Sequence, residues 1–87
     1  MTGDFPSVNR HFRLQWEEAQ QAWVLLYPEG MVKLNGSAGE IMRRCDGTRP
    51  VGAIVAELEQ AFTTSGLHDD VVAFLDMAAQ QRWVTLT

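Results

Sequence analysis

The spacing of apolar residues changes period near the middle of the chain, and this change limits the possible folds more than any other feature. Up to Leu34 the apolar residues alternate with polar ones or form short dense runs, which is typical of β-strands. From Ser37 onward they recur every three or four residues, as on one face of a helix. A sheet followed by helices indicates an α+β fold, and 87 residues suffice for one such domain.

Three strands are expected in the first part of the chain. The alternating segment 12–17 predicts the first strand, the dense apolar run 22–27 the second, and the segment 31–34 the third. Between the last two, Pro28 and Gly30 occupy the second and fourth positions of a tight turn. Strands linked so closely are expected to form an antiparallel meander, with the first and third strands at its edges.

Two helices are expected in the middle of the chain. The first is predicted over 38–45, with Ser37 and Glu40 forming a capping box at its start. The second begins at Pro50, which suits a first helical turn. The apolar face of this second helix is expected to carry Val51, Ile54, Val55, Leu58 and Phe62.

A third helix is expected to follow the break at Gly66. Asp69 and Asp70 place negative charge in its first turn, and Arg82 places positive charge in its last, as the helix dipole favours. The residues expected on its buried stripe are Val71, Phe74, Leu75 and Ala78. A short closing strand or extended tail is expected over 83–86.

The predicted elements define a winged-helix-like domain over residues 12–87. The second and third helices, joined by a short turn, have the outline of a helix-turn-helix with a sheet beside it. Residues 1–11 mix glycine, proline and polar residues without a period, and a flexible N-terminal arm is therefore expected there.

The helix-turn-helix outline raises a DNA-binding regulator as one possible function. The charge argues against it, because nucleic-acid affinity comes largely from clustered lysine and arginine. The formal net charge is −4, and Lys33 is the only lysine. Asp69, Asp70 and Asp76 lie on the third helix, in the place of a recognition helix. We therefore expect no nucleic-acid partner.

The sequence also argues against export and membrane insertion. The first residues carry neither a basic segment nor an apolar run, and no later stretch approaches the roughly 20 apolar residues that span a bilayer. Cys45 is the only cysteine and suits a reducing compartment. A cytoplasmic protein is expected, with Cys45 as a small buried residue.

Residues capable of catalysis are few and scattered. His11 and His68 are distant in sequence from each other and from Cys45, without the short spacings of a metal site. A glycine-rich phosphate loop and a cysteine triplet for an iron–sulfur cluster are both missing from the sequence. The sequence therefore predicts a protein that is not an enzyme, with no catalytic residues, no metal and no cofactor.

Several short segments occur in a particular order and spacing along the chain. They are Leu26-Tyr27-Pro28-Glu29-Gly30, Val32-Lys33-Leu34-Asn35, Ile41 leading to Cys45-Asp46-Gly47, Ile54-Val55-Ala56-Glu57-Leu58, Asp70-Val71 with Phe74-Leu75, and Trp83. In this order the segments closely resemble the PqqD family, over about residues 12–86.

The resemblance implies a role in making pyrroloquinoline quinone (PQQ). Members of the family act as peptide-binding adaptors, or peptide chaperones, that bind the precursor peptide PqqA. They present it to PqqE, a radical S-adenosylmethionine enzyme that crosslinks a Glu and a Tyr of the peptide. Related domains hold leader peptides in other peptide-modification pathways, and the sequence leaves that alternative open.

The resemblance also implies where a peptide binds. Family members add the peptide as a strand beside the third strand, in the groove between that strand and the third helix. Carried over to this chain, the groove residues are Met31, Val32, Lys33 and Leu34 on the strand side, and Val71, Val72, Leu75, Ala79 and Arg82 on the helix side.

Two points about this groove stay open from sequence. Val71, Leu75 and Ala79 fall on or near the stripe expected to pack on the sheet, so each also fits a place in the core. The alternation of residues 31–34 does not show which pair of side chains faces the helices.

The first strand is an edge as well, and with Phe5 and Val8 on the arm it favours a monomer or a weak homodimer formed by strand addition or arm exchange.

Overall fold

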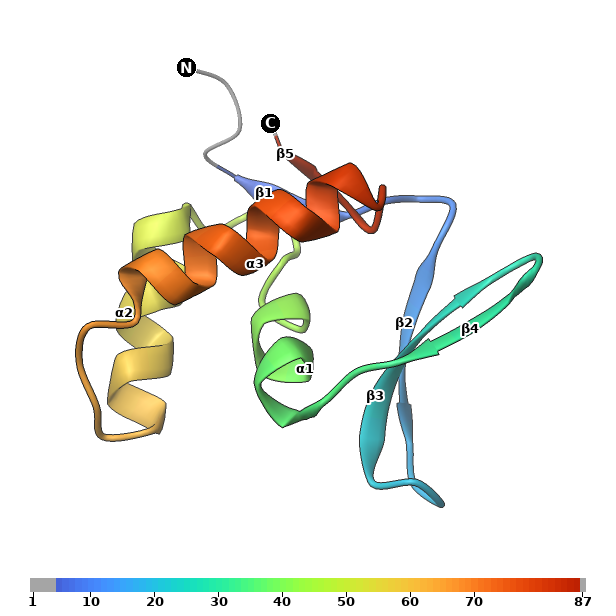
Figure 1. Ribbon diagram of the computed structural model, residues 1–87, viewed down its shortest axis with the longest axis horizontal. Helices are drawn as coiled ribbons and strands as arrows, with labels where there is room; N and C mark the ends of the chain where they lie inside the picture. Colours follow the sequence, from blue (N-terminus) through green and yellow to red (C-terminus); the bar gives the residue numbers. More distant parts are fainter. Residues whose placement is uncertain (1–4, 87) are drawn as a thin grey trace.

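The computed structural model describes residues 5–86, and it confirms the α+β class with a three-stranded antiparallel sheet followed by three helices. In Figure 1 the sheet stands at one side, and α3 crosses over α1 toward α2. The elements are β1 (Pro6–Val8), β2 (Arg13–Glu17), β3 (Ala22–Tyr27), β4 (Gly30–Lys33), α1 (Gly36–Met42), α2 (Val51–Ala61), α3 (His68–Gln80) and β5 (Val84–Leu86).

The main sheet has the predicted order β2-β3-β4, with both pairs antiparallel. Tyr27 pairs with Gly30 across the two-residue turn that contains Pro28, so the turn sets the register of β3 against β4. β2 and β4 are therefore the edges, as predicted.

The face of this sheet that meets the helices carries Leu25, Val32 and Leu34. Leu25 lies opposite Val32, and directly opposite residues of paired strands point to the same face. Leu34 is only 4% exposed and belongs to the core, whereas Met31 is 49% exposed. The open question about β4 is thus answered: Val32 and Leu34 face the helices, and Met31 and Lys33 lie on the opposite face.

α1 packs closely against β3 because a glycine lies at the contact. A Cβ atom at Gly39 would stand 2.8 Å from Cδ1 of Trp23, which is too close for any real side chain. The absence of a side chain at Gly39 therefore lets α1 lie directly on the indole of Trp23 and holds the start of α1 beside the end of β4.

The start and end of α1 differ from the prediction. Asn35, and not Ser37, is the N-cap: its Oδ1 accepts a hydrogen bond from the amide of Ala38 at 2.7 Å. Asparagine caps as well as serine, and Asn35 follows directly on the extended strand, so the helix begins two residues early. α1 ends at Met42 and does not reach Cys45, because the next turn tightens to bonds between residues three apart, such as Cys45 N–H to the Met42 carbonyl at 3.0 Å.

The features predicted for α2 and α3 are largely confirmed, with three differences. Phe62 lies one residue beyond α2 and is 51% exposed. Phe74 is only half-buried. The prediction that Arg82 lies in the last turn of α3 is wrong. α3 ends at Gln80, and Arg82 has a φ of 65°, outside the right-handed helical range.

Residues 6–9 do not form the flexible arm expected over 1–11. β1 pairs with β5 in a second, two-stranded sheet, and the amide of Asn9 donates to the carbonyl of Trp83 at 2.8 Å. Pro6 is among the fully buried side chains. The expectation failed because β1 is only three residues long and its partner lies at the far end of the chain, so no local period reveals it. Residues 1–4 of the expected arm lie outside the described residues.

The core gathers side chains from the sheet, all three helices and β5. Its fully buried members include Leu25, Met42 and Ile54. Cys45 is buried as predicted, its Sγ lies 3.2 Å from the Ile41 carbonyl, and burial raises the pKa of its thiol to about 12. Among residues 5–86, none of the helices has the length and apolar character needed to cross a bilayer.

Candidate binding groove

The outer edge of β4 offers backbone groups to a further strand. The amide of Leu34 donates to the carbonyl of Trp23 at 2.9 Å, which fixes the alternation of inward and outward groups along β4. Val32 therefore turns its N–H and C=O toward β3. Met31 and Lys33 turn theirs away from the sheet. Within residues 5–86, neither of these two amides donates to a backbone acceptor outside the sheet.

A hollow of about 280 Å³ lies beside this edge, between the end of β4 and α3. Its apolar lining comes from Val32 and Leu34 on the strand side and from α3 and the segment after it on the other side. The full lining is Val32, Lys33, Leu34, Asn35, Ser37, Ala38, Phe74, Met77 and Trp83. We call this hollow, together with the outer edge of β4, the groove.

α3 presents two different faces. Val71 and Leu75, each 2% exposed, form with Ala78 the stripe that packs into the core. Phe74 and Met77, three residues apart, lie on a neighbouring face and line the hollow. The ring of Phe74 also contacts the ring of Trp83, with centroids 6.5 Å apart. The helix thus uses one face for stability and leaves another partly open.

The structure separates the predicted groove residues into three groups. Val32, Lys33 and Leu34 line the hollow, and the backbone of Met31 joins the free edge although its side chain lies on the other face of the sheet. Val71 and Leu75 belong to the core. The three that neither line the hollow nor lie fully in the core are Val72, Ala79 and the exposed Arg82.

Phe74, Met77 and Trp83 line the groove but were missing from the sequence-based set. Phe74 was expected on the buried stripe, and Met77 was given no role. A signal for them existed, since Phe74 and Met77 are large apolar residues offset by one position from Leu75 and Ala78. A helix with two adjacent apolar stripes covers more surface than one core contact requires.

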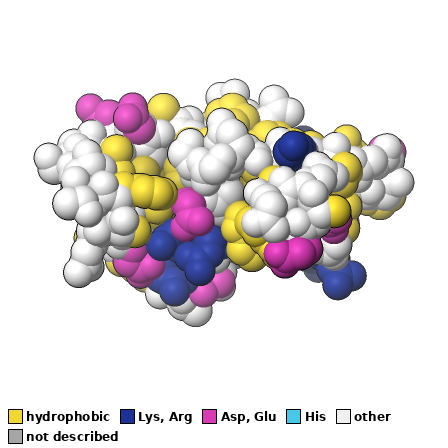
Figure 2. Space-filling view, turned by 90° about the horizontal axis from the view of Figure 1, so that it is seen from below, with side chains coloured by type: hydrophobic (Ala, Val, Ile, Leu, Met, Phe, Trp, Pro, Cys, Tyr) yellow, Lys and Arg dark blue, Asp and Glu magenta, His cyan; other side chains and the backbone are white. Residues whose placement is uncertain are grey.

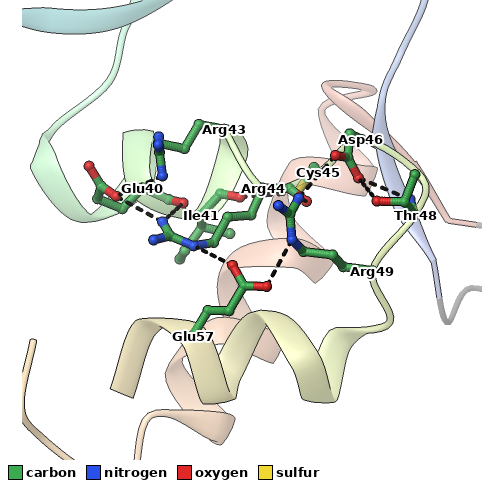
Figure 3. A network of polar contacts seen from close by, with 9 residues as sticks. All are labelled: Glu40, Ile41, Arg43, Arg44, Cys45, Asp46, Thr48, Arg49 and Glu57. Atoms are coloured by element: carbon green, nitrogen blue, oxygen red, sulfur yellow. Dashed lines mark hydrogen bonds and ion pairs between the residues drawn. The ribbon is translucent and has the colours of Figure 1, made fainter. Parts of the chain in front are cut away.

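A group of charged side chains lies elsewhere, between α1 and α2. In Figure 3, Arg44 and Arg49 both reach the carboxylate of Glu57. Arg44 Nε lies 3.1 Å from one oxygen, Oε1, and Arg49 Nε lies 2.8 Å from the other, Oε2. Arg44 also donates to Glu40 at 2.8 Å, and Arg49 to Asp46 at 2.9 Å. We call these five residues the ion-pair cluster. In Figure 2 basic and acidic side chains lie side by side near the middle of that face.

The electrostatics of the ion-pair cluster are those of a structural contact. Hydrogen bonds from Thr48 lower the pKa of Asp46, and the hydrogen bond and charge of Glu57 raise the pKa of Arg49. Both shifts favour the charged forms, so the pairs persist around neutral pH. Across residues 5–86, no three His, Cys, Asp or Glu side chains lie close enough together to hold a metal ion.

Comparison with known proteins identifies the family of this chain. A family model described as Coenzyme PQQ synthesis protein D (PqqD) matches residues 22–84. The chain belongs to the PqqD family. The matched segment contains β4, α3 and Trp83, so both sides of the groove lie within the part that the PqqD model describes.

Curated PqqD relatives are similar along nearly their whole length. The chain is 52% identical over 82 residues to the PqqA binding protein of Stutzerimonas stutzeri, covering 93% of this chain and 89% of that one. It is 54% identical over 82 residues to the PqqA binding protein of Pseudomonas aeruginosa, with the same coverage. The PqqA binding protein of Klebsiella pneumoniae is 53% identical over 80 residues, covering 91% and 87%.

A solved PqqD structure shares the fold. The solution NMR structure of the PqqD truncation of Methylobacterium extorquens PqqCD matches with a TM-score of 0.75 and 28% identity, covering 92% of this chain and 87% of that chain. That truncation is described as a functional, stand-alone recognition element for ribosomally synthesized and post-translationally modified peptides. The sheet and three helices of this chain therefore form the architecture of a PqqD recognition element.

Proposed function

We propose that this chain binds the precursor peptide PqqA in the groove and presents it to the radical S-adenosylmethionine enzyme PqqE during PQQ biosynthesis. The observation that carries the proposal is the free edge of β4 directly beside a half-buried apolar surface of α3. Relatives more than 50% identical over nearly the whole chain are PqqA binding proteins, which supports PqqA as the peptide.

The groove combines the two contributions that an extended peptide needs. Ordering each peptide residue costs about 1 to 2 kcal/mol, while each backbone hydrogen bond returns about 0.5 to 1.5 kcal/mol. The outward groups of Met31 and Lys33 alone therefore do not hold a peptide. Burying a large apolar side chain against Phe74, Met77 or Trp83 contributes about 1.5 to 3 kcal/mol more. Two such anchors bring a flexible peptide to about micromolar affinity.

In this proposal the chain has no turnover of its own and acts in the cytoplasm as a monomer or weak homodimer. The pairing of β1 with β5 argues against arm exchange as a route to dimers. The remaining route is strand addition at the edge of β2, which is only five residues long. Crosslinking chemistry belongs to the partner enzyme, because the groove is lined by apolar residues and by Lys33, Asn35 and Ser37.

The alternative of a DNA-binding regulator is disfavoured by the surface of α3. Asp69, Asp70 and Asp76 are all exposed on this helix, so its outer surface repels phosphate. A leader peptide of another modification pathway would use the same groove, and a direct comparison of peptides separates that alternative from PqqA.

Two proline variants of β4 test the proposed site. Lys33→Pro removes an amide that points outward, so the sheet should stay intact while an added strand loses one donor. Val32→Pro removes an inward amide and should unfold the sheet. Titration of labelled PqqA should show about a tenfold loss of affinity in folded Lys33→Pro, or about 1.4 kcal/mol.

Circular dichroism of both variants is the control that identifies the folded one. A folded Lys33→Pro variant that binds PqqA as tightly as the parent would place the peptide elsewhere, most directly on the edge of β2. An equally tight complex with an unrelated leader peptide would argue against PqqA as the specific partner.

A further inference from the structure

A second hollow of about 310 Å³ lies among the three helices. Its lining is largely apolar: Ile41 from α1, Leu58 from α2, Val71 and Phe74 from α3, and the half-exposed Phe62. The full lining is Ser37, Ile41, Leu58, Phe62, Leu67, Asp70, Val71 and Phe74. Its volume is at the small end of the roughly 300 to 1,000 Å³ typical of ligand pockets, which suits one large side chain.

This second hollow continues the groove along α3. Ser37 and Phe74 line both hollows. Passing along the helix from its end to its start, Met77 and Phe74 line the first hollow, and Phe74 and Asp70 line the second. These three residues are spaced by three and four, so they share one face of α3. In Figure 1, α3 begins beside α2 and passes over α1 toward the side of the molecule where the sheet stands.

The distance between the hollows suits a single peptide chain. Asp70 and Met77 are separated by about 10 Å along the helix axis, at about 1.5 Å per residue. An extended chain covers that distance in about three residues, at about 3.3 Å each. A peptide paired with β4 that continues past Leu34 therefore reaches the second hollow within a few residues.

The outer wall of the second hollow is held open by local backbone structure. The amide of Leu67 donates to Oε2 of Glu59 at 3.0 Å, which ties the loop after α2 back onto that helix. Thr63 has a φ of 51°, an unusual value for a residue other than glycine, and turns the chain sharply after Phe62. Phe62 consequently remains 51% exposed at the rim and does not fold into the core.

Negative charge lies at the end of the path that is farther from β4. Asp70 lies at the rim of the second hollow, with Asp69 next to it in sequence. A peptide with a basic residue near the end that reaches α2 is complementary to this arrangement.

We propose that the second hollow is a separate anchor site for the bound peptide, taking one large apolar or aromatic side chain, with a neighbouring basic residue facing Asp70. This inference rests on the proposed function, since the occupant is the peptide paired with β4. It adds a specificity site that lies about three peptide residues beyond the strand-paired segment. Recognition then depends on apolar anchors at two separated positions and on the charge beside the second.

An alanine scan of labelled PqqA against two protein variants tests the proposal. Phe62→Ala removes one wall of the second hollow at a half-exposed position. Trp16→Ala is the matched control, because Trp16 is a large apolar residue that is 41% exposed, lies on β2 and lines neither hollow. One apolar peptide position should cost about tenfold in affinity when changed to alanine with the parent and with Trp16→Ala. With Phe62→Ala the same change should cost no more than about twofold.

The proposal is supported if alanine at one peptide position lowers the affinity for the parent but not for Phe62→Ala. The second anchor site would be overturned if Phe62→Ala bound every peptide of the scan as tightly as the parent does. It would also be overturned if Phe62→Ala bound every peptide more weakly by the same factor, since that indicates a change in the fold. Asp70→Asn gives an independent check with little change of shape: affinity should fall by about threefold and depend less on salt. An unchanged salt dependence would contradict the charge complementarity.

The two proposals fail in different ways. If Lys33→Pro weakens binding and Phe62→Ala does not, the peptide uses the edge of β4 but not the second hollow. If Lys33→Pro leaves binding unchanged, the proposed groove itself is wrong. Each variant therefore tests its own part of the account.

Discussion

The ion-pair cluster and the groove differ in how completely their groups are partnered. In the ion-pair cluster each charged group meets an opposite charge, and both oxygens of Glu57 are used. In the groove, the outward amides of Met31 and Lys33 donate to no backbone acceptor outside the sheet, within residues 5–86. The side chain of Met77 stays exposed. The charged groups of the ion-pair cluster are therefore paired within the folded chain. The groove leaves backbone amides and apolar surface that a ligand can contact.

This difference predicts two kinds of mutational effect. Substitutions in the ion-pair cluster should lower the free energy of unfolding and change peptide affinity little. Substitutions on the open face of α3 should lower peptide affinity and change the free energy of unfolding little. The following experiments test whether the two effects separate in this way.

Arg44→Ala should have the largest effect on stability. Arg44 is only 9% exposed and bonds to Glu57, to Glu40 and to the Glu40 carbonyl at 2.9 Å. Its loss takes one partner from each of two partly buried carboxylates, Glu40 and Glu57, and removes a side chain from a buried position. The free energy of unfolding, measured by urea denaturation, should fall by about 2 to 3 kcal/mol.

Arg43→Ala is the matched control for that experiment. Arg43 is the neighbouring residue, its side chain is 44% exposed, and its ion pair with Glu40 is longer, at 3.6 Å. Exposed pairs of this kind contribute about 0 to 1 kcal/mol. Equal losses in the two variants would show that burial and bonding in the ion-pair cluster do not distinguish Arg44.

The buried thiol beside the ion-pair cluster should make stability depend on pH. Burial raises the pKa of Cys45 from 9.0 to about 12, so the unfolded chain loses this proton first. The stabilisation is fully present below about pH 9 and is lost as the pH rises toward about 12. At pH 10 the loss should be about 1 kcal/mol relative to pH 8.

The control for this pH effect is Cys45→Ala, which has no thiol to ionise. Its free energy of unfolding should vary less between pH 8 and pH 10 than that of the parent. Parallel curves for the two proteins would show that another group causes the decline and that Cys45 is not protected by its burial.

Met77→Ala should have the smallest of the three effects, and it should appear in binding. Met77 is 37% exposed and lines the groove, so truncation removes contact area for a peptide side chain but little of the core. PqqA affinity should fall by about three- to fivefold, or about 0.7 to 1 kcal/mol, with the urea midpoint nearly unchanged. A large shift of the midpoint without loss of affinity would reverse the proposed division.

Elements with a strong local pattern could be predicted from sequence, and elements fixed by distant contacts could not. The alternation in β2, the turn at Pro28 and the apolar spacing of α2 are local and were predicted correctly. The start of α1 was wrong because Asn35 and Ser37 are both good caps, and geometry decides between them. β1 was missed because Pro6–Val8 is ordered by β5, at the other end of the chain.

The groove shows the same limit. Its strand side came from the resemblance to the PqqD family, and the order of strands is consistent with it, since β4 is an edge. Its helix side depends on how far α3 is rotated about its own axis, and the sequence-based set placed that rotation about one residue away. Val71 and Leu75 consequently proved to be core, and Phe74 and Met77 line the groove. Two apolar stripes on one helix look alike in sequence when only packing determines which is buried.

Amide hydrogen exchange along β4 tests the central claim most directly. In the free protein, the inward amides of Val32 and Leu34 should be protected, and those of Met31 and Lys33 should exchange rapidly. Saturating PqqA should slow exchange at Met31 and Lys33 by at least about tenfold, because an added strand accepts from both amides. Unchanged exchange at these two residues, with new protection at the outward amides of Leu14 and Trp16 in β2, would contradict the account.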